Sequence, residues 1–287
     1  MGPPQTVSIE TDHGLSIVAD HWPGIRTPVV LAHGGGQTRH SWKSAARALA
    51  AEGHRVLAMD LRGHGDSDWH PDGDYGIEWF AADALEVVDW VGRPVVWIGA
   101  SLGGLTGLIA SARQPQAIAS LVLVDITPRP STEGVERILD FMGQDVEHGF
   151  GSLEEAADAV AAYQPHRPRP ADLSGLAKNL RRGEDGRWRW HWDPRFLGSR
   201  PPSSRLAKNP AEEAARQLAV PTLLVRGRLS DLVTENEAQE FLRLVPHAEY
   251  VDVADAAHMV AGDKNDIFTA VVTRFVANGR LANPEAS

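Results

Sequence analysis

The strongest constraint on the fold of this 287-residue chain is the alternation of short apolar runs with longer amphipathic segments. Several runs are rich in Val, Ile and Leu at successive positions, which is typical of parallel strands covered by helices on both faces. The alternation predicts an α/β fold with a doubly wound, mostly parallel sheet. Strands are expected within residues 6–10, 15–22, 28–36, 55–65, 94–101, 120–128, 221–231 and 248–258. Helices are expected within residues 42–53, 78–92, 105–115, 235–245 and 266–279.

The first two expected strands flank Asp12-His13-Gly14, which indicates a hairpin and gives the sheet an antiparallel start. Further along, residues 128–210 break the alternation, because no convincing strand occurs there. Within this stretch the segments 136–143, 152–163 and 171–183 are predicted to be helical, and the remainder is rich in Pro and Arg. We interpret residues 128–210 as a helical cap inserted into a core that is formed by residues 1–127 and 211–287.

Composition argues against several kinds of site and partner. The chain has no cysteine, and therefore no disulfide, thiolate metal ligand or cysteine nucleophile. HEXXH and similar metal-binding spacings are absent, and the glycine-rich stretches do not match phosphate-binding loops, so neither a metal nor a cofactor is expected. The net charge of −10 disfavours nucleic acid as a partner.

We expect a cytoplasmic protein with no membrane partner. No apolar run approaches the roughly 20 residues that a membrane helix needs. The first residues also lack the basic segment followed by an apolar one that marks a signal peptide. The absence of cysteine fits a reducing compartment.

Positive charge is concentrated in residues 165–208, which hold eleven Lys and Arg but four Asp and Glu. Such a segment could attract an acidic substrate or dock on the acidic remainder of the chain. A solvated, arginine-rich surface is the simpler interpretation, and we favour it.

Ser101 is the expected nucleophile. It lies in Gly99-Ala100-Ser101-Leu102-Gly103, after an expected strand and before an expected helix, which is the context in which G-x-S-x-G exposes a serine on a strained turn. Side chains at the two glycine positions would collide with neighbouring backbone. The N-terminus of the following helix favours negative charge that develops at the site. The alternative is a turn that is merely compact.

A serine nucleophile needs a base, and the base needs a carboxylate that orients it. His258 follows the last expected strand, at the end of the sheet where functional residues gather, and is the expected base. Asp231 lies in the loop after the preceding strand and is the preferred acid, because it gives the chain order Ser, Asp, His. Asp125, after the strand before that one, is the alternative.

The glycine run that follows the third expected strand indicates an oxyanion hole. Acyl transfer needs backbone N–H donors at the developing oxyanion. We expect one donor at Leu102, directly after the nucleophile, and a second at Gly35 in His33-Gly34-Gly35-Gly36. Asp60, Arg62 and His64, which follow the fourth expected strand, are expected to brace loops rather than to act on substrate.

Five segments together resemble motifs of the α/β-hydrolase family. They are HGGGQTRHSW, DLRGHGDSD, GASLGG, RGRLSDLV and DAAHMV, in the family's order between Val29 and His258. The resemblance implies an α/β-hydrolase fold with a cap at residues 128–210. It also implies a serine at Ser101, an acid at Asp231, a base at His258 and oxyanion donors at Gly35 and Leu102.

The resemblance also limits the reaction. Epoxide hydrolases and haloalkane dehalogenases of this family use an aspartate where this chain has Ser101, so neither reaction is expected. We expect a serine hydrolase that cleaves a carboxylic ester or a related acyl compound, a small molecule, through a Ser-His-Asp triad and an acyl-enzyme. The alternatives with the same triad are a cofactor-free peroxidase or perhydrolase and a carbon–carbon bond hydrolase. A ligand receptor without catalysis is a further alternative.

Three tryptophans of the cap segment are candidates for the lining of an apolar substrate pocket. Trp188, Trp190 and Trp192 alternate along the cap, so their rings are expected to share one side and to line a pocket over Ser101 or to pack within the cap. Trp42 is a weaker candidate for the pocket wall.

Overall fold

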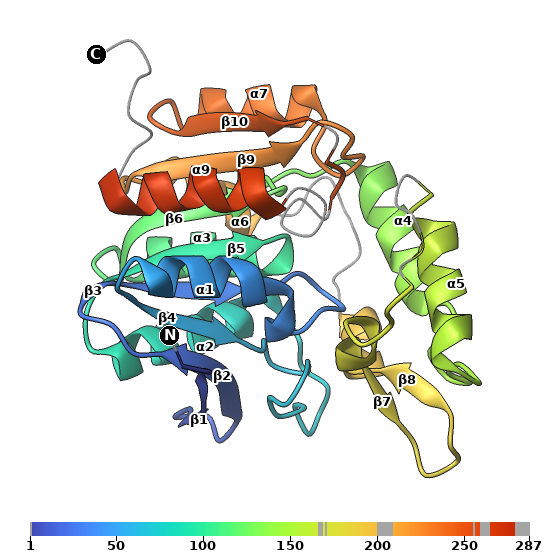
Figure 1. Ribbon diagram of the computed structural model, residues 1–287. Helices are drawn as coiled ribbons and strands as arrows, with labels where there is room; N and C mark the ends of the chain where they lie inside the picture. Colours follow the sequence, from blue (N-terminus) through green and yellow to red (C-terminus); the bar gives the residue numbers. More distant parts are fainter. Residues whose placement is uncertain are drawn as a thin grey trace.

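The computed structural model describes residues 2–165, 169, 171–199, 209–254, 256–258 and 265–278. An eight-stranded sheet forms its centre, in the order β1-β2-β4-β3-β5-β6-β9-β10 (Figure 1). The strands are β1 (Gln5–Glu10), β2 (Ser16–Trp22), β3 (Arg26–Ala32), β4 (His54–Met59), β5 (Val95–Ala100), β6 (Ile118–Val124), β9 (Thr222–Gly227) and β10 (Glu249–Val253). β2 runs antiparallel to both β1 and β4, and the other neighbours are parallel. The predicted sheet with its antiparallel start is confirmed.

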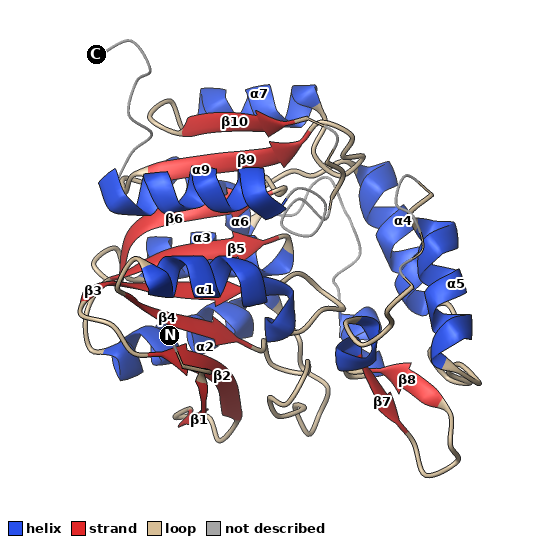
Figure 2. Cartoon of the chain, in the orientation of Figure 1, coloured by secondary structure: helices blue, strands red, loops and turns tan. Residues whose placement is uncertain are grey.

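Helices cover both faces of the sheet, as Figures 1 and 2 show. The core on one face is completed by α1 (Lys43–Ala51) and α9 (Asn265–Asn278). The core on the other face is completed by α2 (Ile77–Val91), α3 (Leu102–Arg113), α6 (Pro210–Gln217) and α7 (Glu235–Leu244). The described residues contain no helix that is long and apolar enough to cross a membrane.

A separate layer lies beyond the ends of the parallel strands, to the right in Figure 2. It is formed by α4 (Thr132–Gly143), α5 (Leu153–Tyr163), the 3₁₀ turns η2 (Leu176–Asn179) and η3 (Pro194–Ser199), and the strands β7 (Leu180–Arg182) and β8 (Trp188–Trp190). Because the chain leaves the sheet after β6 and returns at β9, this layer stands in the place of the expected cap.

Two expectations for the cap were wrong. We expected no strand between 128 and 210 and a helix over 171–183, but β7 and β8 pair as an antiparallel hairpin. The turn between them closes with Gly186 at a φ of +77°, which favours glycine. Leu180 and Trp190 pair in this hairpin and contact a small apolar cluster around Phe150. The side-chain period here is therefore two, as in a strand.

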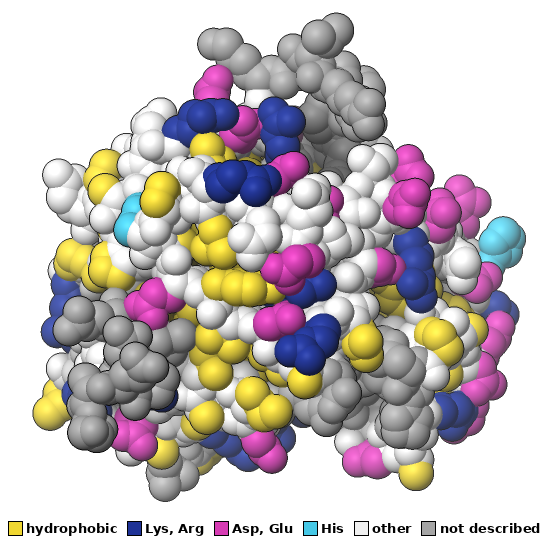
Figure 3. All heavy atoms as spheres, turned by 90° about the horizontal axis from the view of Figure 1, so that it is seen from above, with side chains coloured by type: hydrophobic (Ala, Val, Ile, Leu, Met, Phe, Trp, Pro, Cys, Tyr) yellow, Lys and Arg dark blue, Asp and Glu magenta, His cyan; other side chains and the backbone are white. Residues whose placement is uncertain are grey.

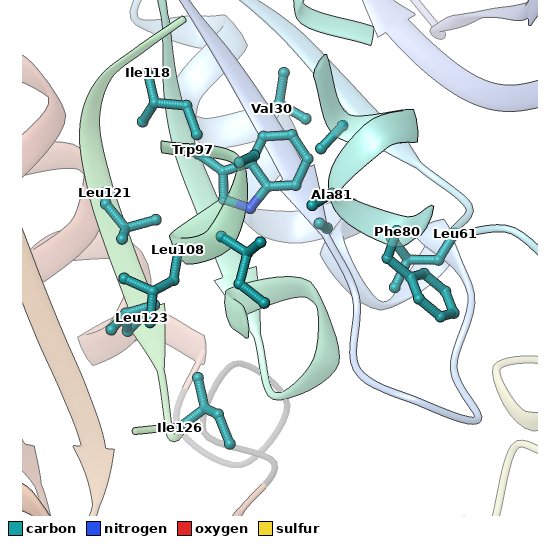
Figure 4. Packing of buried hydrophobic residues seen from close by; sticks show 14 of the residues in the cluster. Val30, Leu61, Phe80, Ala81, Trp97, Leu108, Ile118, Leu121, Leu123 and Ile126 are labelled. Atoms are coloured by element: carbon teal, nitrogen blue, oxygen red, sulfur yellow. The ribbon is translucent and has the colours of Figure 1, made fainter. Parts of the chain in front are cut away.

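Trp97 on β5 fixes helix α3 against the sheet. Its indole is fully buried and lies beside Val30 and Ala81 in Figure 4. The indole Nε1 donates to the carbonyl of Gly103, at 2.9 Å. A Cβ on Gly107 would lie only 2.2 Å from the ring, so the helix backbone itself packs on the indole. The N-terminus of α3 is thereby held at a fixed position.

Arg62 and Asp83 form a buried ion pair next to this core. Two guanidinium nitrogens of Arg62, Nε and Nη2, donate to Asp83 at 2.5 and 2.7 Å, and both side chains are almost completely buried. His13 approaches the same carboxylate at 2.7 Å. The pair ties the loop after β4 to α2, which confirms the expected bracing role of Arg62.

Replacing Asp83 with alanine should lower the free energy of unfolding by about 3–5 kcal/mol, because Arg62 would remain buried without its counter-charge. Urea denaturation measures this change. The matched control is Asp89→Ala on the same helix, where the side chain is exposed and the change should stay within about 0.5 kcal/mol. Equal losses in the two variants would contradict this account of the pair.

Candidate active site

Ser101 occupies the turn between β5 and α3 in a strained conformation. Its φ is +46° and its ψ is −113°, a region that non-glycine residues rarely adopt. A Cβ on Gly99 would lie 2.2 Å from the carbonyl oxygen of Gly103, and one on Gly103 would lie 2.3 Å from that of Ala32. The predicted collision at both glycine positions is therefore confirmed. The turn presents Ser101 at the carboxyl end of β5, at the N-terminus of α3.

The glycine loop after β3 lies directly against this serine. A Cβ on Gly34 would be 3.3 Å from the Cβ of Ser101. Among the described residues, the N–H groups of Gly35 and Leu102 donate to no other group. Within the described part of the chain, these two N–H groups are therefore left without an acceptor, and they belong to the residues that the sequence singled out for an oxyanion hole.

Two buried histidines hold the glycine loop in place. His33 Nδ1 donates to the carbonyl of Gly34 at 2.8 Å, and its Nε2 accepts from the N–H of Leu61 at 3.0 Å. His64 Nδ1 donates to the carbonyl of Arg62, and its Nε2 accepts from the N–H of Gly36 at 3.1 Å. These bonds require neutral rings. Burial lowers the pKa of His33 to about 4 and that of His64 to about 3.

Asp60 connects the loop after β4 to the segment at Arg39. It is fully buried and accepts from the backbone N–H of Arg39 and from the Arg39 guanidinium. Its oxygen also accepts from the N–H of Asp66 at 3.0 Å. Asp60 and His64 therefore brace loops, as the sequence predicts, and both are withdrawn from the surface.

His258 contacts Asp125. Its Nδ1 lies 2.7 Å from Asp125 Oδ2, and Asp125 is completely buried at the end of β6. Ser101 donates its backbone N–H to the carbonyl of Val124, so the serine and Asp125 end neighbouring strands. A Cβ on Gly227 would lie 2.3 Å from the carbonyl oxygen of Ala257, so the His258 loop packs on the end of β9.

The preference for Asp231 as the partner of His258 was wrong, and the alternative, Asp125, occupies that position. Asp231 points to the surface, with 39% of its side chain exposed, and accepts from Arg137 of α4 at 2.8 Å. The physical reason lies in the turn at Gly227, where the N–H of Ser230 bonds the carbonyl of Gly227. This turn directs Ser230 inward to Asp125 and leaves the next residue outside.

Trp42 is a core residue rather than a pocket wall. Only 1% of it is exposed, and its ring lies 5.9 Å from that of Phe268 on α9. It belongs to the apolar cluster between the sheet and helices α1 and α9, on the far side of the sheet from α3. The expectation that Trp42 contributes to the pocket was therefore wrong.

The three cap tryptophans do not share one environment. Trp190 and Trp192 line a cavity of about 120 Å³ together with Trp69 and Arg181. Trp188 instead exchanges backbone hydrogen bonds with Phe150. Trp192 pairs with His64, so the cavity borders the loop after β4. Packing within the cap, one of the two expected roles, accounts for the contacts of Trp188, whereas Trp192 joins this layer to the loop after β4.

Two cap residues that the sequence did not indicate touch the glycine loop. A Cβ on Gly35 would lie 3.5 Å from the ring of Phe196, and one on Gly36 would lie 3.2 Å from Met142 Cε. Phe196 is held by aromatic rings at centroid distances of 5.1–6.3 Å, from His64, Tyr75, Phe80 and Trp192. Phe196 is a single apolar residue in the short turn η3, where no repeating pattern can develop, so no sequence signal could have found it.

Within the described part of residues 165–208, the arginine side chains have partners in the molecule. All of them have a carboxylate or carbonyl acceptor: Arg169, Arg181, Arg182, Arg187, Arg189 and Arg195. A different face of the molecule, the one seen from above in Figure 3, shows basic and acidic side chains interspersed. These contacts favour the simpler interpretation, an arginine-rich surface, because charges with partners inside the molecule do not form a focused field that would attract an acidic substrate. Exposed ion pairs of this kind contribute little to stability.

The fold and this site define an α/β hydrolase. A family model described as the alpha/beta hydrolase fold matches residues 27–264, and the chain belongs to that family. An esterase of Mycobacterium tuberculosis, Rv0045c, is 31% identical over 267 residues, which cover 89% of this chain and 85% of the esterase. A 2-(acetamidomethylene)succinate hydrolase of Mesorhizobium japonicum is 31% identical over 232 residues, which cover 77% of this chain and 78% of that enzyme.

Solved structures agree with this assignment. The crystal structure of an E-2-(acetamidomethylene)succinate hydrolase superposes with a TM-score of 0.82 at 23% identity, over 95% of this chain and all of that one. The structure of the Rv0045c esterase superposes with a TM-score of 0.77 at 28% identity, over 96% of this chain and 93% of the esterase. The named relatives are esterases and hydrolases, and this chain is a hydrolase of the same family.

Lowering the pH from 7 to 5 should destabilise the protein through His64. The pKa of His64 is about 3 in the folded state and 6.5 for the unperturbed side chain, as in the unfolded chain. Only the unfolded chain therefore takes up a proton at this residue between pH 7 and pH 5. The free energy of unfolding should therefore fall by about 2 kcal/mol from this residue alone. Urea denaturation at both pH values should show a correspondingly smaller fall for His64→Gln. The exposed His148 provides the control, because His148→Gln should retain the full fall.

Proposed function

We propose that this hydrolase cleaves a carboxylic ester or a related acyl compound through a covalent acyl-enzyme. Ser101 is the nucleophile, His258 the general base and Asp125 the acid that orients the base. The observation that carries the proposal is the 2.7 Å contact of His258 Nδ1 with the buried Asp125, at the end of the strand next to the strained Ser101 turn.

The first half of the reaction forms the acyl-enzyme. With Nδ1 bonded to Asp125, the Nε2 of His258 is free to take the proton of the Ser101 hydroxyl as the oxygen attacks the acyl carbon. The N–H groups of Gly35 and Leu102 stabilise the oxygen of the tetrahedral intermediate. The alcohol then leaves with the proton held by His258. Asp125 stabilises the imidazolium while this proton is in place.

The second half returns the free enzyme. A water molecule gives a proton to His258 and attacks the acyl carbon of the ester on Ser101, and the same two N–H donors stabilise the second intermediate. His258 then returns its proton to the Ser101 oxygen, and the carboxylic acid leaves. The esterase among the relatives supports an ester as substrate. The hydrolase named for acetamidomethylene succinate supports the wider class of acyl compounds.

A fluorophosphonate probe should label the wild-type protein at serine, and Ser101→Ala should abolish the labelling. Intact-protein mass spectrometry measures the adduct. Ser111→Ala, which removes a buried hydroxyl from the other end of α3, should leave labelling unchanged. Labelling of Ser101→Ala to the wild-type extent would overturn the proposed nucleophile.

The two aspartates should separate clearly in kinetics. Asp125→Asn should lower kcat for p-nitrophenyl acetate by a factor of about 10⁴, the loss known when the orienting carboxylate of a serine triad becomes an amide. Asp231→Asn should leave kcat within about twofold, because this side chain is on the surface and pairs with Arg137. The reverse ranking would restore Asp231 as the acid.

A further inference from the structure

We propose that Ser230 is a positioning residue of the active site, which holds the Asp125 carboxylate in the orientation that receives His258. This inference rests on the proposed function, since it assigns a role to the residue that contacts the proposed acid.

The argument begins with one shared oxygen. Asp125 Oδ2 accepts from the Ser230 hydroxyl at 2.5 Å and from His258 Nδ1 at 2.7 Å. Its Oδ1 accepts from the N–H of Gly227 at 3.0 Å. The two oxygens therefore have different partners, and rotation of the carboxylate would break all three bonds. Ser230 and Asp125 are both buried, at 7% and 0% exposed, so water does not readily replace the hydroxyl.

The direction of the Ser230 hydroxyl bond is fixed by its own surroundings. Its oxygen accepts from the N–H groups of Leu232 and Val233, at 3.1 and 3.2 Å. A hydroxyl has one proton and two lone pairs. Because both acceptor positions are taken by backbone donors, the proton is directed to Asp125. The serine thus connects the carboxylate to the turn that ends in Val233.

The same turn contacts the loop that bears the base. The N–H of Leu229 donates to the carbonyl of Ala256 at 2.8 Å, two residues before His258. Asp125 itself has a φ of +48°, a conformation that costs energy in a non-glycine residue and persists only where its surroundings enforce it. The Ser230 hydroxyl therefore fixes the proposed acid, Asp125, and belongs to a turn that also contacts the loop of the proposed base, His258.

Removing the hydroxyl should have two separable effects on catalysis. The carboxylate would be free to turn away from His258, so the proton transfers would slow. When the Asp125 carboxylate does face His258, its Oδ2 would no longer share its negative charge with the Ser230 hydroxyl. The carboxylate would therefore stabilise the protonated imidazole more strongly. Substrate contacts are not involved, so KM should not change.

The test compares Ser230→Ala with wild type, Ser230→Thr and the buried-hydroxyl control Ser111→Ala, using p-nitrophenyl acetate across pH 5–9. Ser230→Ala should lower kcat by about 10- to 100-fold at unchanged KM, and should move the acidic limb of kcat/KM upward by about half a pH unit. Ser230→Thr keeps the hydroxyl and should restore the acidic limb to the wild-type position. Ser111→Ala should match wild type.

A Ser230→Ala enzyme with wild-type kcat and wild-type pH profile would overturn the inference. A lower melting temperature with an unmoved acidic limb would overturn it too, because it would show a structural role alone. Probe labelling distinguishes this failure from failure of the proposed function. If wild type is labelled at Ser101 while Ser230→Ala behaves as wild type, only the role of Ser230 is lost.

Discussion

The carboxyl end of the sheet is arranged around one buried carboxylate. A buried charge is costly unless donors surround it, and Asp125 obtains its donors from three separate segments. These are the end of β9 at Gly227, the turn at Ser230 and the loop of His258. The need to satisfy one side chain therefore draws together parts of the chain that are more than a hundred residues away from it. The position of the proposed base follows from that requirement.

On the side of the site that is formed by Ser101 and the glycine loop, the structure depends on close backbone packing. Trp97 and the glycines at the start of α3 bring this helix against the strand ends, and Ser101 is left in a strained turn between them. Two neutral histidines then hold the adjacent glycine loop by bonds to its backbone. The proposed oxyanion donors at Gly35 and Leu102 thus belong to elements that are held by these contacts, as preorganised oxyanion stabilisation requires.

Much of this arrangement could be predicted from the sequence, where local patterns were sufficient. Strand ends followed by glycine or by Ser101 were visible as motifs, and His258 follows the last strand. Asp125 and Asp231 both follow strands, and chain order favoured Asp231. The decision depends on a turn that directs Ser230 inward, and the sequence carries no sign of where it points. The hairpin in the cap was missed because its strands are three residues long.

Phe196 connects the layer beyond the strand ends to the glycine loop. It lies in the layer that stands in the place of the expected cap, and its ring lies beside Gly35 of the glycine loop. Exchange of this layer for another would therefore also alter the packing around the glycine loop. A change in this layer that is meant to alter substrate range would therefore have to preserve the packing of Phe196, so that the proposed oxyanion donor at Gly35 stays in place.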